Sequence, residues 1–168
     1  ILINHGTQPF VIEPGMKIFL ATGSSEPRTL VRHLLSSDLP NLQDLELLQI
    51  VSLGDLITVR DLQSHKFRLK TFFSGWVASD AITGGLVDLI PCRFTRIPSL
   101  IDSGLLPVDA AFIQVTPPNE AGFVSLGVSV DVARQVMDKA RLVVGEVNDR
   151  VPYTYGDTFF HVDEFDCL

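Results

Sequence analysis

Residues 17–27 read KIFLATGSSEP, and this stretch decides the class of fold. It opens with a short apolar run that follows the turn residues 13–15, a pattern typical of a buried strand. Residues 22–27 are rich in glycine and serine and end in Pro27. Proline suits the first helical turn because its missing N–H is not needed there. The stretch therefore predicts a strand, a polar turn and a helix in direct succession.

The predicted helix covers residues 27–36. We expect Ser24 or Ser25 to cap it, and Glu26 to complement the positive end of its dipole as an acid in the first turn. Its apolar residues recur with helical spacing. They are Leu30, Val31, Leu34 and Leu35.

The same alternation of apolar runs and amphipathic stretches continues to the end of the chain. Further strands are predicted at residues 47–53, 67–73, 110–115, 142–147 and 159–162, and further helices at 76–82, 97–101 and 129–140. Asp131 is expected near the positive end of the last helix. Strands that are apolar on both faces and separated by helices indicate an α/β fold. The prediction is one domain over residues 1–168, with an open, mostly parallel sheet and helices on both faces.

Composition excludes several classes of protein. The chain has 168 residues, 46% of them hydrophobic, and a formal net charge of −7. A disordered chain is poorer in apolar residues, and a sequence-independent nucleic-acid binder needs a basic surface. No apolar run reaches the roughly 18 residues of a membrane span. We therefore expect neither a nucleic acid nor a membrane as a partner.

The two cysteines and the one basic run carry little chemistry. Cys92 and Cys167 form no metal-ligand spacing and no disulfide framework, so we expect no metal site and a cytoplasmic protein with reduced thiols. The run HKFRLK at residues 65–70 favours a solvated strand edge, with an anionic partner as the alternative. The chain also lacks a P-loop, a dinucleotide fingerprint and the nucleophile elbow of a hydrolase.

Polar residues follow three of the predicted strands. They are Gly23, Ser24 and Ser25 after the first strand, Thr116 and Asn119 after residues 110–115, and Asn148 after residues 142–147. Ligands of open parallel sheets bind at the carboxyl ends of the strands. A glycine-rich turn that enters a helix also offers backbone N–H groups to an anion. The alternative is that these exits are turns without a ligand.

The stretch QVTPPNEAGFVSLG at residues 114–127 resembles the pattern S-P-P-D-x-x-G-[YF]-x-S-[LF]-G of the acetyl-CoA hydrolase/transferase family. Members of that family include the acetate and 4-hydroxybutyrate CoA-transferases. The resemblance begins near Val11, and other family motifs follow in order. They are GSSEP at 23–27, FFSG at 72–75, IP at 90–91, RIP at 96–98, LLPVD at 105–109, A-x-x-[IV]-x-E-[VI]-N ending at 146–148, Pro152, GD at 156–157 and HV at 161–162. Thr116, Asn119 and Ala121 depart from the usual serine, aspartate and histidine.

The resemblance implies the N-terminal lobe of a class I CoA-transferase or of an acyl-CoA hydrolase, in which water replaces the acceptor acid, and the sequence leaves this choice open. In such transferases a glutamate attacks an acyl-CoA and carries CoA to a second carboxylic acid through a glutamyl-CoA intermediate. No residue here matches that glutamate's motif, so we expect no catalytic residue in this chain, a C-terminal catalytic lobe outside it, and no activity of the chain alone. Glu26 and Glu146 are not candidates for the nucleophile, and Glu146 is instead expected to pair with Arg141, Arg150 or a group between the lobes.

Within this frame the lobe would form one wall of the acyl and carboxylate pocket. Backbone N–H groups near Ser24 and Ser25, with the side chains of Asn119 and Asn148, would bind a carboxylate or a developing oxyanion. An Asx turn is the alternative for Asn148. The expected partners are acyl-CoA, short carboxylic acids and the C-terminal lobe, with CoA as a substrate, no cofactor, and homo-oligomerisation left open. A stand-alone α/β binding module without chemistry is the competing hypothesis.

Overall fold

A computed structural model describes residues 12–168 except 41, 52–55, 65 and 75–78. The main sheet holds six of the described strands, in the order β4-β3-β2-β1-β5-β7, and every neighbouring pair is parallel. Their bounds are β1 Lys17–Leu20, β2 Leu45–Gln49, β3 Phe67–Thr71, β4 Val87–Leu89, β5 Ala110–Val115 and β7 Leu142–Val147. The α/β class and the parallel sheet predicted from the sequence are confirmed.

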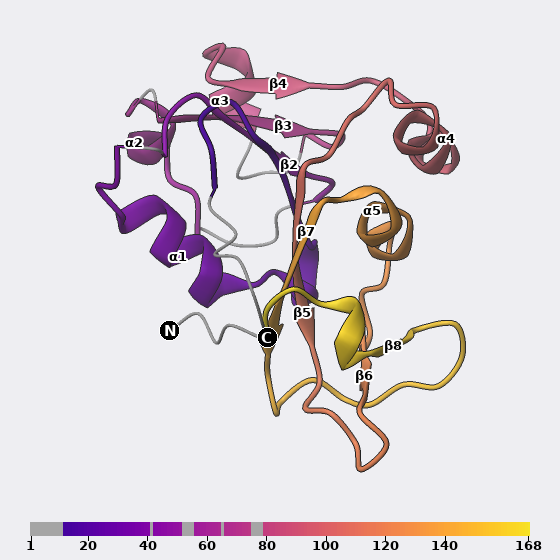
Figure 1. Cartoon of the computed structure of the whole chain (residues 1–168). Helices are drawn as coiled ribbons and strands as arrows, with labels where there is room; N and C mark the ends of the chain where they lie inside the picture. The colour runs from indigo at the N-terminus through magenta and orange to yellow at the C-terminus, as the bar shows by residue number, and fades with distance from the viewer. Residues whose placement is uncertain (1–11, 41, 52–55, 65, 75–78) are drawn as a thin grey trace.

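Helices cover both faces of this sheet, as predicted (Figure 1). The α-helices are α1 Arg28–Ser36, α2 Val59–Leu62, α3 Ser79–Thr83, α4 Ile97–Asp102 and α5 Ala133–Lys139. Residues on α1, α2 and α3 pack on one face, in a core that includes Ile18 and Leu47 from the sheet. Residues on α4 and α5 pack on the other face, in a core that includes Phe19 and Leu48. Successive residues of β1 and β2 therefore bury opposite faces, because strand side chains alternate.

A small antiparallel sheet joins β6 Phe123–Ser125 to β8 Phe159–His161, and it packs against the α5 side of the main sheet. Three short 3₁₀ turns complete the described elements. They are η1 Gly23–Ser25, η2 Phe94–Arg96 and η3 Val162–Glu164.

The order of strands in the main sheet changes direction between β1 and β5. β2, β3 and β4 follow on one side of β1, and β5 and β7 follow on the other. Such a switch point is where open α/β sheets bind ligands.

Most of the predicted elements are present, with shifted ends. The strand predicted at 47–53 is β2, which begins two residues earlier, and the helix predicted at 129–140 begins only at Ala133. The helix predicted at 76–82 is represented by α3, and part of the predicted range lies outside the described residues. Six elements were missed because they are very short: α2, β4, β6 and the turns η1, η2 and η3.

The described part of the basic run, residues 66–70, does not lie at an edge of the sheet, so the interpretation as a strand edge is wrong. β3 lies between β2 and β4, and its basic side chains form cross-strand ion pairs. Lys70 lies 2.7 Å from Glu46, and Arg68 lies 2.9 Å from Asp88. The hydrogen bond from Arg68 lowers the pKa of Asp88. Lys66 donates to the carbonyl oxygens of Leu35 and Ser37 at the end of α1. These cations are therefore paired within the fold.

Candidate functional site

The three polar strand exits lie on adjacent strands. β1 pairs with β5 through Leu20 and Phe112, and β5 pairs with β7 through Val115 and Val147. The carboxyl ends of all three strands therefore meet at one edge of the sheet, at the switch point. The residues after these ends are the η1 turn, the segment from Thr116 to Asn119, and Asn148.

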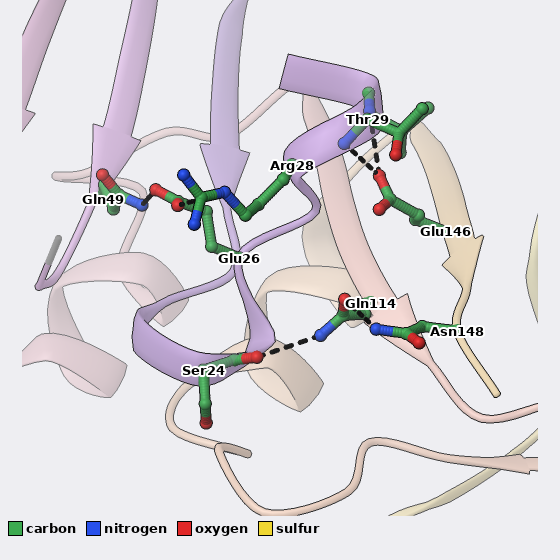
Figure 2. Close-up of polar contacts among 9 residues, drawn as sticks. Ser24, Glu26, Arg28, Thr29, Gln49, Gln114, Glu146 and Asn148 are labelled. Atoms are coloured by element: carbon green, nitrogen blue, oxygen red, sulfur yellow. Dashed lines mark hydrogen bonds and ion pairs between the residues drawn. The ribbon is translucent and has the colours of Figure 1, made fainter. Parts of the chain in front are cut away.

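Two side-chain amides connect the first and last of these exits (Figure 2). Asn148 Nδ2 donates a hydrogen bond of 2.9 Å to Gln114 Oε1. Gln114 Nε2 in turn donates one of 3.0 Å to the carbonyl oxygen of Ser24. Asn148 Oδ1 also accepts from the backbone N–H of Arg150 at 2.9 Å, so Asn148 does form an Asx turn. The sequence analysis did not identify Gln114, although a glutamine inside a buried apolar strand was a visible signal.

Within the described structure, two of the three N–H groups of the η1 turn donate to backbone carbonyl oxygens, and the third, that of Ser24, does not. Gly23 N–H donates to Val51, and Ser25 N–H donates to Thr22 at 3.0 Å. Ser25 is buried, whereas Ser24 is exposed. Among the described residues, neither the N–H nor the hydroxyl of Ser24 has a hydrogen-bond partner. Ser24 is therefore the donor of this turn that a ligand could use.

The positive end of α1 is occupied, contrary to expectation. Glu146 Oε2 accepts hydrogen bonds of 2.9 Å from the backbone N–H groups of Thr29 and of Leu30 (Figure 2). No serine side chain caps the helix, because Ser24 and Ser25 lie in η1, and Glu26 and Pro27 separate them from the first helical residue. Glu146 is also not paired with Arg141 or Arg150, which lie beside Asp109 and Asp149. Glu146 therefore occupies these two N–H groups, and the η1 turn is the place where an anion at this edge could find a donor.

Glu26 is a buried residue rather than a first-turn acid of the helix. It is 5% exposed, and Gln49 Nε2 donates a hydrogen bond of 2.8 Å to its Oε1. Arg28 Nε lies 4.0 Å from the other carboxylate oxygen. Gln49 Oε1 is buried and has no partner among the described residues. The hydrogen bond between Gln49 and Glu26 joins the end of β2 to the segment between η1 and α1.

Two residues before α5 fix the start of the η1 turn. Thr22 Oγ1 donates to Asp131 at 2.8 Å, and Ser129 Oγ donates to the Thr22 carbonyl oxygen at 3.1 Å. Asp131 has a φ of 52° and lies before the first residue of α5. The prediction that the helix includes residue 131 is therefore wrong. Burial raises the pKa of Asp131 above its ordinary value, and the hydrogen bonds from Thr22 and Val132 offset this in part. The sequence analysis assigned no role here to Thr22, Ser129 or Asp131.

Thr116 and Asn119 form a separate group in the β5–β6 turn. Thr116 is buried, and its Oγ1 accepts from Ser125 N–H at 2.9 Å. Asn119 Oδ1 accepts from the N–H groups of Ala121 and Phe123, at 3.0 and 2.9 Å. Asn119 Nδ2 donates to the Tyr153 hydroxyl at 3.2 Å. The hydrogen bonds of these two residues therefore shape the turn, and none of them joins Asn148 or Ser24 within the described part of the chain.

An aromatic pocket of about 450 Å³ lies beside Asn119. It is lined by Asn119, Phe123, Tyr153, Tyr155 and Phe159.

Across the described ranges, no group of three metal-ligating side chains lies together, and no helix is long and apolar enough to cross a membrane.

Comparisons with known proteins place the chain in a family. Residues 8–168 match the model of the acetyl-CoA hydrolase/transferase N-terminal domain. The chain is 36% identical to 4-hydroxybutyrate coenzyme A transferase of Clostridium kluyveri over 157 residues, which are 94% of this chain and 36% of that protein. It is 34% identical to succinyl-CoA:acetate/propanoyl-CoA:succinate CoA transferase of Fasciola hepatica, with coverage of 94% and 33%.

Solved structures share the fold. The chain is similar to RipA from Yersinia pestis with a TM-score of 0.76 at 22% identity, over 92% of this chain and 38% of that one. It is also similar to 4-hydroxybutyrate CoA-transferase from Porphyromonas gingivalis, with a TM-score of 0.68 at 23% identity and coverage of 92% and 35%. The chain thus spans about a third of the length of these relatives. The motif order, the parallel sheet and the family match agree: the chain belongs to the acetyl-CoA hydrolase/transferase family and corresponds to its N-terminal domain.

Proposed function

We propose that the protein is a CoA-transferase that moves CoA from an acyl-CoA to a short carboxylic acid, with this chain forming one wall of the acyl and carboxylate pocket. The curated relatives are CoA transferases by name, which supports this activity. The observation that carries the proposal is that Ser24, an exposed residue at the switch point of the sheet, has an N–H without a partner among the described residues. The surrounding turn is held by contacts from β2, β5 and the segment before α5.

The chemistry needs a carboxylate nucleophile, which we place in a C-terminal lobe outside residues 1–168. A carboxylate oxygen of the nucleophilic glutamate attacks the thioester carbonyl. An acyl-glutamyl anhydride forms, and the CoA thiolate is the leaving group. The thiolate then attacks the glutamyl carbonyl, which releases the first acid and forms the glutamyl-CoA thioester. A second carboxylate reverses these steps and leaves with CoA. Every step passes through a tetrahedral oxyanion that an N–H donor can stabilise.

Ser24 N–H is the donor that we assign to this oxyanion. One preorganised donor of this kind is worth roughly 3 kcal/mol in a dry site. Gly23 and Ser25 shape the turn around this donor. Asn148 is linked to Ser24 by the hydrogen bonds of Gln114. Thr116 and Asn119 fix the neighbouring loop, and Asn119 brings an amide to the aromatic pocket beside it. CoA enters as a substrate, and the proposal needs no resident cofactor.

The test is a transfer assay on the complete protein with acetyl-CoA and a series of short carboxylic acids, 4-hydroxybutyrate, propionate and succinate among them. The proposal expects a new acyl-CoA for at least one acid, without net release of free thiol. Thiol release without a new acyl-CoA would indicate a hydrolase, and no turnover of any kind would indicate a binding module. We place the activity in the cytoplasm, where acyl-CoA is available.

A further inference from the structure

The end of β7 and the residue after it hold two points of the chain after β1: the η1 turn and the first turn of α1. Asn148 reaches the Ser24 carbonyl oxygen through Gln114, and Glu146 accepts from the N–H groups of Thr29 and Leu30 (Figure 2). The two contacts start from residues two positions apart on one strand and end five or six positions apart on the other segment. The geometry of the η1 turn is therefore set from β7, across the intervening strand β5.

Gln114 is suited to transmit this constraint because it is buried and fully used. It is 5% exposed, and both its oxygen and its nitrogen make a hydrogen bond. A buried amide without partners costs about 1–3 kcal/mol, so the side chain has a strong preference for this arrangement. The relay also has a direction. Asn148 must donate for Gln114 to present its own nitrogen to Ser24.

The relay acts on the peptide group next to the Ser24 donor. Ser24 N–H shares a peptide plane with the Gly23 carbonyl, which accepts from Glu26 N–H at 3.3 Å. The following peptide contains the Ser24 carbonyl held by Gln114 and the Ser25 N–H held by Thr22. Fixing both planes fixes the backbone of residue 24, and with it the direction in which its N–H points.

We propose that Gln114 and Asn148 are positioning residues: they hold the Ser24 N–H in the orientation that binds the oxyanion, and they do not touch the substrate. This inference rests on the proposed CoA-transferase function. It also changes the role of Asn148, because the side-chain oxygen of this residue serves the Asx turn and the side-chain nitrogen serves the relay.

A double-mutant cycle in the complete protein tests the proposal. Gln114→Met keeps the length of the side chain and removes both hydrogen bonds. Asn148→Ser keeps an oxygen for the turn with Arg150 and removes the donor to Gln114. Each single variant should lower kcat by about 10- to 100-fold and leave the KM for acyl-CoA within about twofold, because misplacing a catalytic donor affects the transition state. The double variant should be no slower than Gln114→Met alone.

The proposal would be overturned if the fold-decreases in kcat of the two single variants multiplied in the double variant. A rise in KM confined to Asn148→Ser would also overturn it, because Asn148 would then act on the substrate independently of Gln114. Asp88→Asn is the matched control. It removes the carboxylate that Arg68 contacts at the far edge of the sheet and should leave kcat unchanged.

Amide hydrogen exchange gives a readout that does not depend on activity. Peptides covering residues 22–26 should exchange faster in both single variants than in the wild type, and equally fast in the double variant. Unchanged exchange in this segment would overturn the relay even if kcat fell. An inactive wild-type protein with faster exchange in the variants would contradict the proposed function and leave the relay standing, so the two failures are distinguishable.

Discussion

The Glu146 carboxylate, near the end of β7, accepts a hydrogen bond of 2.9 Å from the backbone N–H of Leu30 in the first turn of α1. A helix that follows the first strand is thus capped by a residue more than 100 positions later in the chain. The contact supplies the negative charge that the helix dipole favours, from inside the protein.

Replacement of Glu146 should destabilise the fold. Glu146→Ala leaves the N–H groups of Thr29 and Leu30 without their acceptor and should lower the free energy of unfolding by about 1–2 kcal/mol. Glu146→Gln keeps an acceptor oxygen and should cost about half as much. Urea denaturation measures both changes. Glu120→Ala, at an exposed position, is the control, and an equal midpoint for Glu146→Ala and this control would contradict the capping role.

At position 119 the oxygen should matter more than the amide nitrogen. Asn119→Ala removes the acceptor for Ala121 and Phe123 N–H and should cost about 1–2 kcal/mol of stability. Asn119→Asp keeps that acceptor and loses only the contact with Tyr153, so it should cost less than about 0.5 kcal/mol. Thermal unfolding distinguishes them. The interpretation of the turn would be wrong if the aspartate variant were the less stable of the two.

Asp131 makes stability depend on pH. Its pKa in the folded state is raised by burial above the ordinary value of 3.8, so the folded protein binds more protons than the unfolded chain in the window above 3.8. The contribution of Asp131 to the free energy of unfolding therefore falls as pH rises through that window. Asp131→Asn cannot titrate and retains an acceptor for Thr22, and its side chain tolerates the positive φ.

Denaturation of the wild type and of Asp131→Asn at pH 4 and at pH 7 measures this effect. The variant should gain stability relative to the wild type as the pH rises. Asp138→Asn, at an exposed position on α5, should follow the wild type. Parallel pH profiles for the wild type and Asp131→Asn would show that burial of Asp131 has no such consequence.

The donor assigned to the oxyanion can be removed without breaking a hydrogen bond of the described structure. Ser24→Pro deletes the free N–H, whereas Ser24→Ala deletes only the hydroxyl. In the complete protein, Ser24→Pro should lower kcat by about 10²- to 10³-fold, and Ser24→Ala by less than about threefold. Circular dichroism checks that both variants are folded. A folded Ser24→Pro variant with the kcat of the wild type would exclude the backbone donor.

The sequence predicts the strands of this fold best where both faces are buried. Residues 110–115 and 142–147 were predicted with the bounds that the structure has, because continuous apolar runs of this length are typical of parallel strands covered on both faces. The β2 strand was shifted because Glu46 interrupts its apolar run, although Lys70 compensates this charge on the neighbouring strand. The strands β4 and β6 have three residues each, which are too few for a periodic signal.

The candidate site was predictable only in part. The strand exits follow from local patterns, and the sheet order confirms that those of β1, β5 and β7 lie together. The role of Glu146 could not be predicted, because its partners are backbone N–H groups, which carry no side-chain signature. The relay through Gln114 joins three residues from distant parts of the sequence, and only the parallel pairing of the strands brings them into contact.

Isotope exchange tests the central claim most directly. The complete protein is incubated with unlabelled acetyl-CoA and labelled acetate, without any other acceptor, and the label in acetyl-CoA is followed with time. A CoA-transferase with a glutamyl-CoA intermediate should incorporate the label until it is shared between acetate and acetyl-CoA, with no net loss of thioester. Loss of thioester without incorporation, or no incorporation at any acetate concentration, would contradict the account.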